Sequence, residues 1–106
     1  MIQIDGKTLE QIIEYFEKDE KGFKGLAFVP SYDLFPERVN DILNRMKDLG
    51  FKIPRRMPSI YNECLFINLM KKEIDVGSFE KFGIKIYSIV SSEVLEEVLN
   101  HFYKWK

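Results

Sequence analysis

Gly25-Leu26-Ala27-Phe28-Val29 is the stretch that decides the fold, an unbroken apolar run that ends at Pro30. A strand with one solvated face alternates apolar and polar residues, whereas this run has no polar position. Unbroken apolarity over so short a run is typical of a strand buried on both faces, as in a parallel pair. The run therefore predicts a buried strand within a covered sheet.

The residues before this run predict a strand and a helix. Residues 1–4 are expected to form a short strand with Ile2 and Ile4 on one face. Thr8 lies three positions before Gln11, the spacing of a capping box, and this pattern predicts a helix start. The apolar face of that helix consists of Leu9, Ile12, Ile13 and Phe16. Strand, helix and buried strand form a βαβ unit, which should cross over right-handed.

Downstream of the run, a second helix is predicted from Pro36, which suits a first turn, to Gly50, which suits the position after a helix end. A short strand is expected at residues 51–53, before Pro54. The nearly continuous apolar run at 63–70 predicts a further strand.

The last third of the chain predicts a connection, a strand and a helix. Residues 71–81 are polar and are expected to connect two strands. The strand at 82–90 is expected to pair antiparallel with its predecessor, since no helix is predicted between them. Ser91 or Ser92 caps the final helix. The apolar face of that helix consists of Val94, Leu95, Val98, Leu99 and Phe102.

The predicted order is β-α-β-α-(β)-β-β-α, a mixed sheet of four to five strands with three helices in one domain of 106 residues. We assign it to the α/β class, near the boundary with α+β. The order resembles the thioredoxin-like arrangement, in which a βαβ unit leads through a helix to a ββα unit, and it also resembles small βαβαββ RNA-binding domains. The thioredoxin redox motif needs two cysteines, and only Cys64 is present, so dithiol chemistry is excluded.

Composition limits the function classes. A net charge of −1 gives no global positive field that would attract nucleic acid or anionic lipid. The N-terminus lacks the charged and apolar regions of a signal peptide, and no apolar run approaches a membrane span. We expect a cytoplasmic protein, and its richness in Lys and Glu resembles a thermophile composition.

The residues with reactive side chains do not form a catalytic constellation. Cys64 lies in an apolar run and is interpreted as a small core residue. His101 has only Glu93 and Glu97 as possible ligands on its own helix face, which does not complete a metal site. The glycines are dispersed without a phosphate-binding loop, so no cofactor is expected.

The segment at 51–61 is the strongest functional signal, because it is basic and conformationally restricted by two prolines. Arginine and aromatic planes are used in single-stranded RNA recognition, and the same groups serve protein interfaces. The predicted contact residues are Lys52, Arg55, Arg56 and Tyr61, joined in space by Lys71 and Lys72.

A second candidate surface is aromatic. Tyr103 and Trp105 fall outside the apolar face of the last helix, and Tyr15 lies beside that of the first. Aromatic side chains with polar tips are enriched at interfaces, and homodimers are the commonest oligomers. These residues therefore predict an oligomer interface.

Two functions remain open from the sequence. We favour a small non-enzymatic binding protein that is homo-oligomeric and contacts a protein or nucleic-acid partner through 51–61 and the C-terminal aromatics. The alternative is a metal-dependent nuclease or phosphodiesterase. It would use Asp5 and Asp33, which follow the first two predicted strands, where α/β sheets commonly bind ligands.

Overall fold

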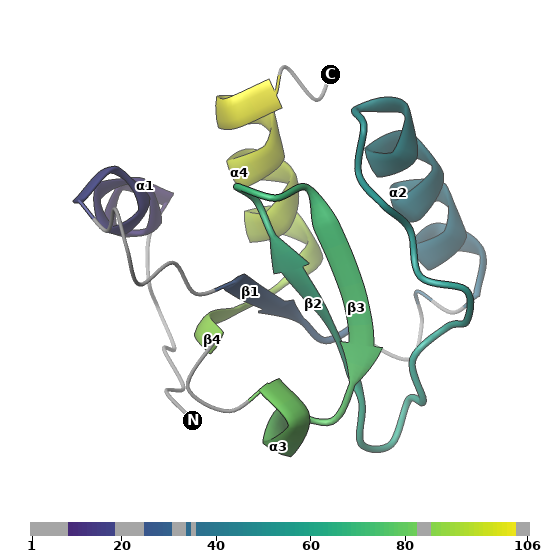
Figure 1. Ribbon diagram of the computed structural model, residues 1–106. Coiled ribbons are helices and arrows are strands. Elements are labelled where there is room, and N and C mark those ends of the chain that lie inside the picture. The colour runs from purple at the N-terminus through teal and green to yellow at the C-terminus, as the bar shows by residue number, and fades with distance from the viewer. Residues whose placement is uncertain (1–8, 19–24, 31–33, 35, 83–85, 104–106) are drawn as a thin grey trace.

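The computed structural model describes residues 9–18, 25–30, 34, 36–82 and 86–103, and the predicted strand at 1–4 lies outside these residues. The described elements are α1 (Leu9–Lys18), β1 (Gly25–Phe28), α2 (Glu37–Asp48), β2 (Cys64–Asn68), β3 (Glu73–Gly77), α3 (Phe79–Phe82), β4 (Ile86–Val90) and α4 (Ser92–Tyr103). They form a domain of α/β type with one mixed sheet, as the sequence predicts (Figure 1).

The sheet has the strand order β3-β2-β1-β4. β1 pairs antiparallel with β2 and parallel with β4, while β3 pairs antiparallel with β2. The apolar run that forms β1 is therefore an interior strand with a parallel neighbour, as its composition predicts. β3 lies at one edge of the described sheet.

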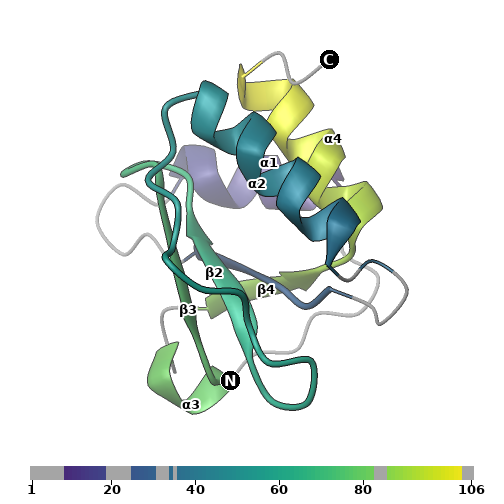
Figure 2. The same ribbon diagram turned by 90° about the vertical axis from the view of Figure 1, so that its right-hand side faces the viewer.

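The register of the strands divides the sheet into two faces. One row across the sheet consists of Val90, Phe28, Leu65 and Val76, and the next consists of Ile89, Ala27, Phe66 and Asp75. The first row joins the main core with residues of α1, α2 and α4. Figure 2 shows these helices together on one face, with α3 on the other. There Phe66 stacks on Phe82, with ring centroids 4.7 Å apart.

The end of α2 and the start of α4 lie where the sequence predicts. Gly50, just after α2, has a φ of 98°, a left-handed conformation that glycine adopts without steric cost. The Phe51 N–H donates to the Met46 carbonyl oxygen at 3.1 Å, as in a Schellman motif. At the start of α4, the Ser91 hydroxyl oxygen accepts from the Val94 N–H at 3.3 Å, so Ser91 is the cap.

The prediction for the region after β2 is wrong in two respects. Residues 71–81 contain β3 and α3 rather than a plain connection. The strand predicted at 82–90 begins at Ile86 and pairs with β1, because β3 takes the place beside β2. The antiparallel pairing predicted between 63–70 and 82–90 is therefore wrong, and β2 pairs instead with β1 and β3.

Candidate functional site

The segment that follows α2 runs along the outer edge of β3 (Figure 1). In this segment the Lys52 N–H donates to the Lys72 carbonyl oxygen at 2.8 Å, and the Lys52 carbonyl oxygen accepts from the Ile74 N–H at 3.0 Å. The residue that would continue this parallel ladder is Pro54, which has no N–H. In the described chain, the strand predicted at 51–53 is therefore a single bridge.

Beyond this bridge, two residues of β3 turn their backbone groups away from the sheet. Ile74 donates outward to Lys52, so Val76, two positions further, also has outward backbone groups. The Val76 carbonyl oxygen accepts from Nζ of Lys81 at 3.2 Å. Among the residues that the structure describes, none pairs with the Ile74 carbonyl or the Val76 N–H.

A groove of about 430 Å³ lies along this edge. It is lined by residues 52–56 on one side and by residues 73–76 with Lys81 on the other. Its volume is within the range of ligand sites, roughly 300–1,000 Å³. The groove thus combines open backbone groups, four cationic side chains and the carboxylates of Glu73 and Asp75.

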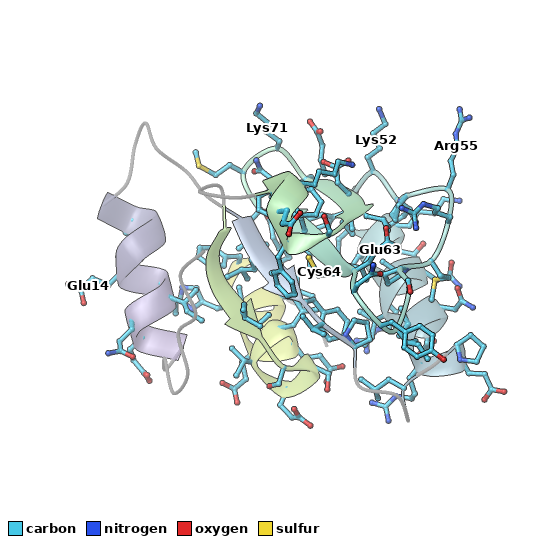
Figure 3. All side chains as sticks on the ribbon, turned by 90° about the horizontal axis from the view of Figure 1, so that it is seen from below. Glu14, Lys52, Arg55, Glu63, Cys64 and Lys71 are labelled. Atoms are coloured by element: carbon cyan, nitrogen blue, oxygen red, sulfur yellow. The ribbon has the colours of Figure 1, made fainter. Side chains whose placement is uncertain are left out.

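Three of the predicted contact residues lie along the same edge. Lys71, Lys52 and Arg55 point to the same side of the molecule (Figure 3), and all three are exposed. Within the described part of the chain they form no ion pair. We call these three residues the cationic row.

Arg56, which the sequence groups with them, is bound within its own loop. Its guanidinium donates to both carboxylate oxygens of Glu63, at 2.6 and 2.7 Å, and Glu63 also accepts from the Ser59 N–H at 2.8 Å. The Arg56 hydrogen bond, and then that from Ser59, lower the pKa of Glu63 to about 2. We call the hydrogen bonds of Glu63 with Arg56 and Ser59 the Glu63 clip. The clip fixes the loop at 56–63 and neutralises the charge of Arg56, so Arg56 contributes less charge to the surface than Arg55 does.

The clip predicts an unusual titration. The folded pKa of Glu63 lies below its ordinary value of about 4.3, so the clip contributes stability above that pH and loses it as pH falls toward 2. We expect the side-chain carboxyl carbon of Glu63 to titrate near pH 2 by NMR. In Arg56→Ala the midpoint should rise, while Arg55→Ala is the matched control and should leave it unchanged. A midpoint near 4.3 in the native protein would contradict the clip.

The side chains of Lys72 and Tyr103 also make contacts within the domain. Nζ of Lys72 donates to the Leu49 carbonyl at 3.1 Å and lies 4.9 Å from the Tyr103 ring centroid. The Tyr103 hydroxyl donates to the Leu69 carbonyl at 2.6 Å, and its ring packs edge-on against Phe51. Burial raises the pKa of Tyr103. These contacts join the β2–β3 turn to α4 and to the end of α2.

The last turn of α4 differs from the predicted apolar face. Phe102, assigned to the core from its spacing, is 36% exposed, whereas Tyr103 packs against the main core. The reason is that Tyr103 can both cover Phe51 and donate its hydroxyl, which a phenylalanine cannot do.

The other predicted residues are not brought to the groove by any described contact. Tyr61 lies in the turn at the tip of the loop and is 90% exposed. Tyr15 belongs to α1, but its side chain lies outside the described part of the structure, as do Trp105, Asp5 and Asp33. The oligomer interface and the metal-dependent alternative therefore stay predictions.

Cys64 and His101 do not form a reactive site among the described residues. Cys64 is fully buried, and desolvation raises its pKa to about 11, which keeps the thiol protonated. His101 is exposed near the end of α4. No cluster of three potential metal ligands occurs in the described ranges, and none of their helices has the length and apolarity needed to cross a membrane.

Sequence reasoning missed the part of the site contributed by β3 and α3. Lys81 and the outward groups of Val76 belong to residues expected to form a connection. A signal was present, since Glu73-Ile74-Asp75-Val76 alternates charged and apolar residues as a half-buried strand does.

Comparison of the chain with models of protein families, with curated proteins and with solved structures finds no match.

Proposed function

We propose that this chain is a non-enzymatic binding protein whose partner contacts the groove beside β3 through the cationic row. The observation that carries the proposal is the alignment of Lys71, Lys52 and Arg55 along one open edge of the sheet. Exposed cations of this kind steer an acidic partner and set its orientation.

Two features favour a protein partner over a nucleic acid. The cationic row has three residues, which would release few counterions from a phosphate backbone. Glu73 and Asp75 are exposed on the same edge and would repel phosphates. An acidic stretch of a protein can place its carboxylates against the cationic row and keep neutral groups near these two residues.

The test uses two labelled anionic probes, the repeated peptide (Glu-Glu-Gly-Gly)₃, in which neutral residues separate the carboxylates, and a deca-uridylate RNA, in anisotropy titrations at low salt and at about 150 mM salt. We expect the peptide to bind and Lys52→Glu/Arg55→Glu to weaken it at least about tenfold, because reversed charges repel the probe. The matched control, Arg38→Glu/Lys47→Glu, makes the same charge change on the exposed surface of α2.

Equal weakening in both variants would show a general charge effect and would contradict the assignment of the surface. No binding of either probe at low salt would overturn the proposal as a whole. Stronger binding of the RNA than of the peptide, lost in Lys52→Glu/Arg55→Glu, would replace the protein partner with a nucleic acid.

A further inference from the structure

We infer that the β3 edge captures an extended acidic segment of a partner protein as an added strand. This inference rests on the proposed function and specifies how the partner binds. It depends on the Ile74 carbonyl and the Val76 N–H, which have no partner among the described residues. An acceptor and a donor spaced in this way are the template for strand addition.

The neighbouring backbone groups limit where such a strand can pair. The Ile74 N–H is taken by Lys52 and the Val76 carbonyl by Lys81. One residue of an incoming parallel strand would donate to the Ile74 carbonyl and accept from the Val76 N–H. In this chain that position falls to Pro54, which cannot donate. The chain's own ladder therefore stops at Pro54, and an outside residue would enter through the groove between residues 52–56 and β3.

The side chains around this position indicate the sequence of the segment. In the register set by Lys52 and Glu73, the central incoming residue lies opposite Asp75, so it should be neutral or basic. Its two neighbours turn toward the other face, where the half-buried Ile53 packs against the main core that includes Val76, so they should be apolar. The outer residues should be acidic to match the cationic row.

A second copy of this chain fits the edge less well than such a segment. Two β3 edges pairing with each other would bring two cationic rows together, and like charges across an interface are unfavourable. Lys81 and Pro54 also resemble devices that protect an edge from pairing with another sheet. A short segment entering the groove needs only the one open acceptor and the one open donor.

The probe is the acetylated and amidated peptide Glu-Glu-Val-Thr-Val-Glu-Glu, whose threonine would lie opposite Asp75 in the parallel register. It is titrated into the ¹⁵N-labelled full chain, with the same peptide N-methylated at threonine as the matched control. We expect the Val76 amide to exchange fast with solvent in the free protein and to become protected on binding. The N-methyl group removes the donor, so its affinity should fall at least about tenfold.

Each other outcome overturns the inference in a recognisable way. Equal binding of both peptides, lost in Lys52→Glu/Arg55→Glu, would exclude the parallel strand addition inferred above but leave the proposed function intact. No binding of either peptide by a chain that does bind (Glu-Glu-Gly-Gly)₃ would likewise exclude strand addition alone, and failure of all three peptides would end both proposals. Slow exchange of the Val76 amide in the free protein would show that the edge is already occupied.

Discussion

Gly25→Ala is expected to destabilise the protein by about 3 kcal/mol, the upper part of the range for overpacking. A Cβ at this position would lie 2.5 Å from the Ile67 carbonyl oxygen and 2.5 Å from Cζ of Phe66. The carbonyl belongs to the backbone of β2, next to β1, and cannot move without distorting the sheet. Urea unfolding followed by circular dichroism measures the loss as a lower midpoint with an unchanged slope.

Gly77→Ala is the matched control, because Gly77 is also a strand glycine. Its Cβ would lie 2.5 Å from Cδ of Lys81 and 3.3 Å from the Phe82 ring. The lysine side chain can swing away, and alanine is the better strand residue, so we expect a change below about 1 kcal/mol. Similar losses in both variants would refute the argument that the backbone contact sets the cost.

A second substitution separates the two contacts at Gly25. Phe66→Leu removes the ring from the path of the new methyl group but leaves the Ile67 carbonyl in place. Phe66→Leu should therefore destabilise the Gly25→Ala variant less than it destabilises the native protein. The double variant should still be less stable than Phe66→Leu alone, because the clash with the Ile67 carbonyl remains. The register between β1 and β4 shifts between Gly25 and Leu26, which is where glycine commonly allows an irregular strand.

The elements that could be predicted are those with a local signal. The run that forms β1 has no polar position, Gly50 marks the end of α2, and Ser91 marks the start of α4. β3 was missed because its five residues include two carboxylates, and the alternation of Ile74 and Val76 is too short to outweigh them.

Strand partners could not be predicted, because pairing is decided by contacts between distant residues. The apolarity of β1 correctly indicated a parallel neighbour, but nothing in the run says that β4 supplies it. The pattern of residues 86–90 would be the same beside β2 as beside β1. Pairing of β4 with β2 is excluded only because β3 already occupies that side of β2.

The site was predictable to a similar extent. Lys52, Arg55 and Lys71 share an edge, as predicted, although Lys71 lies 15 positions after Arg56, the last basic residue of the segment. Lys72 instead donates to the Leu49 carbonyl. Whether a basic side chain faces solvent or a carbonyl depends on the fold, so sequence alone could not separate Lys71 from Lys72.

Phe28→Ala should have the largest effect on stability, a loss of about 4 kcal/mol. Phe28 is 1% exposed and lies between Val90 on β4 and Leu65 on β2, in the row that faces the helices. Removing its ring leaves a cavity that the flanking strands cannot close without breaking their register. For a domain of this size the loss corresponds to a fall in Tm on the order of 20 °C.

Tyr61→Ala is the control for Phe28→Ala, since its ring is 90% exposed and its removal should change stability by less than about 0.5 kcal/mol. Calorimetry gives the Tm of both variants and shows whether the loss of stability follows from the burial of the ring or from the loss of any aromatic residue. A small loss in Phe28→Ala would mean that the helices pack against the sheet loosely enough to fill the space. The main core would then not fix the position of β2. Because β3 pairs with β2, the β3 edge on which the proposed binding depends would not be fixed either.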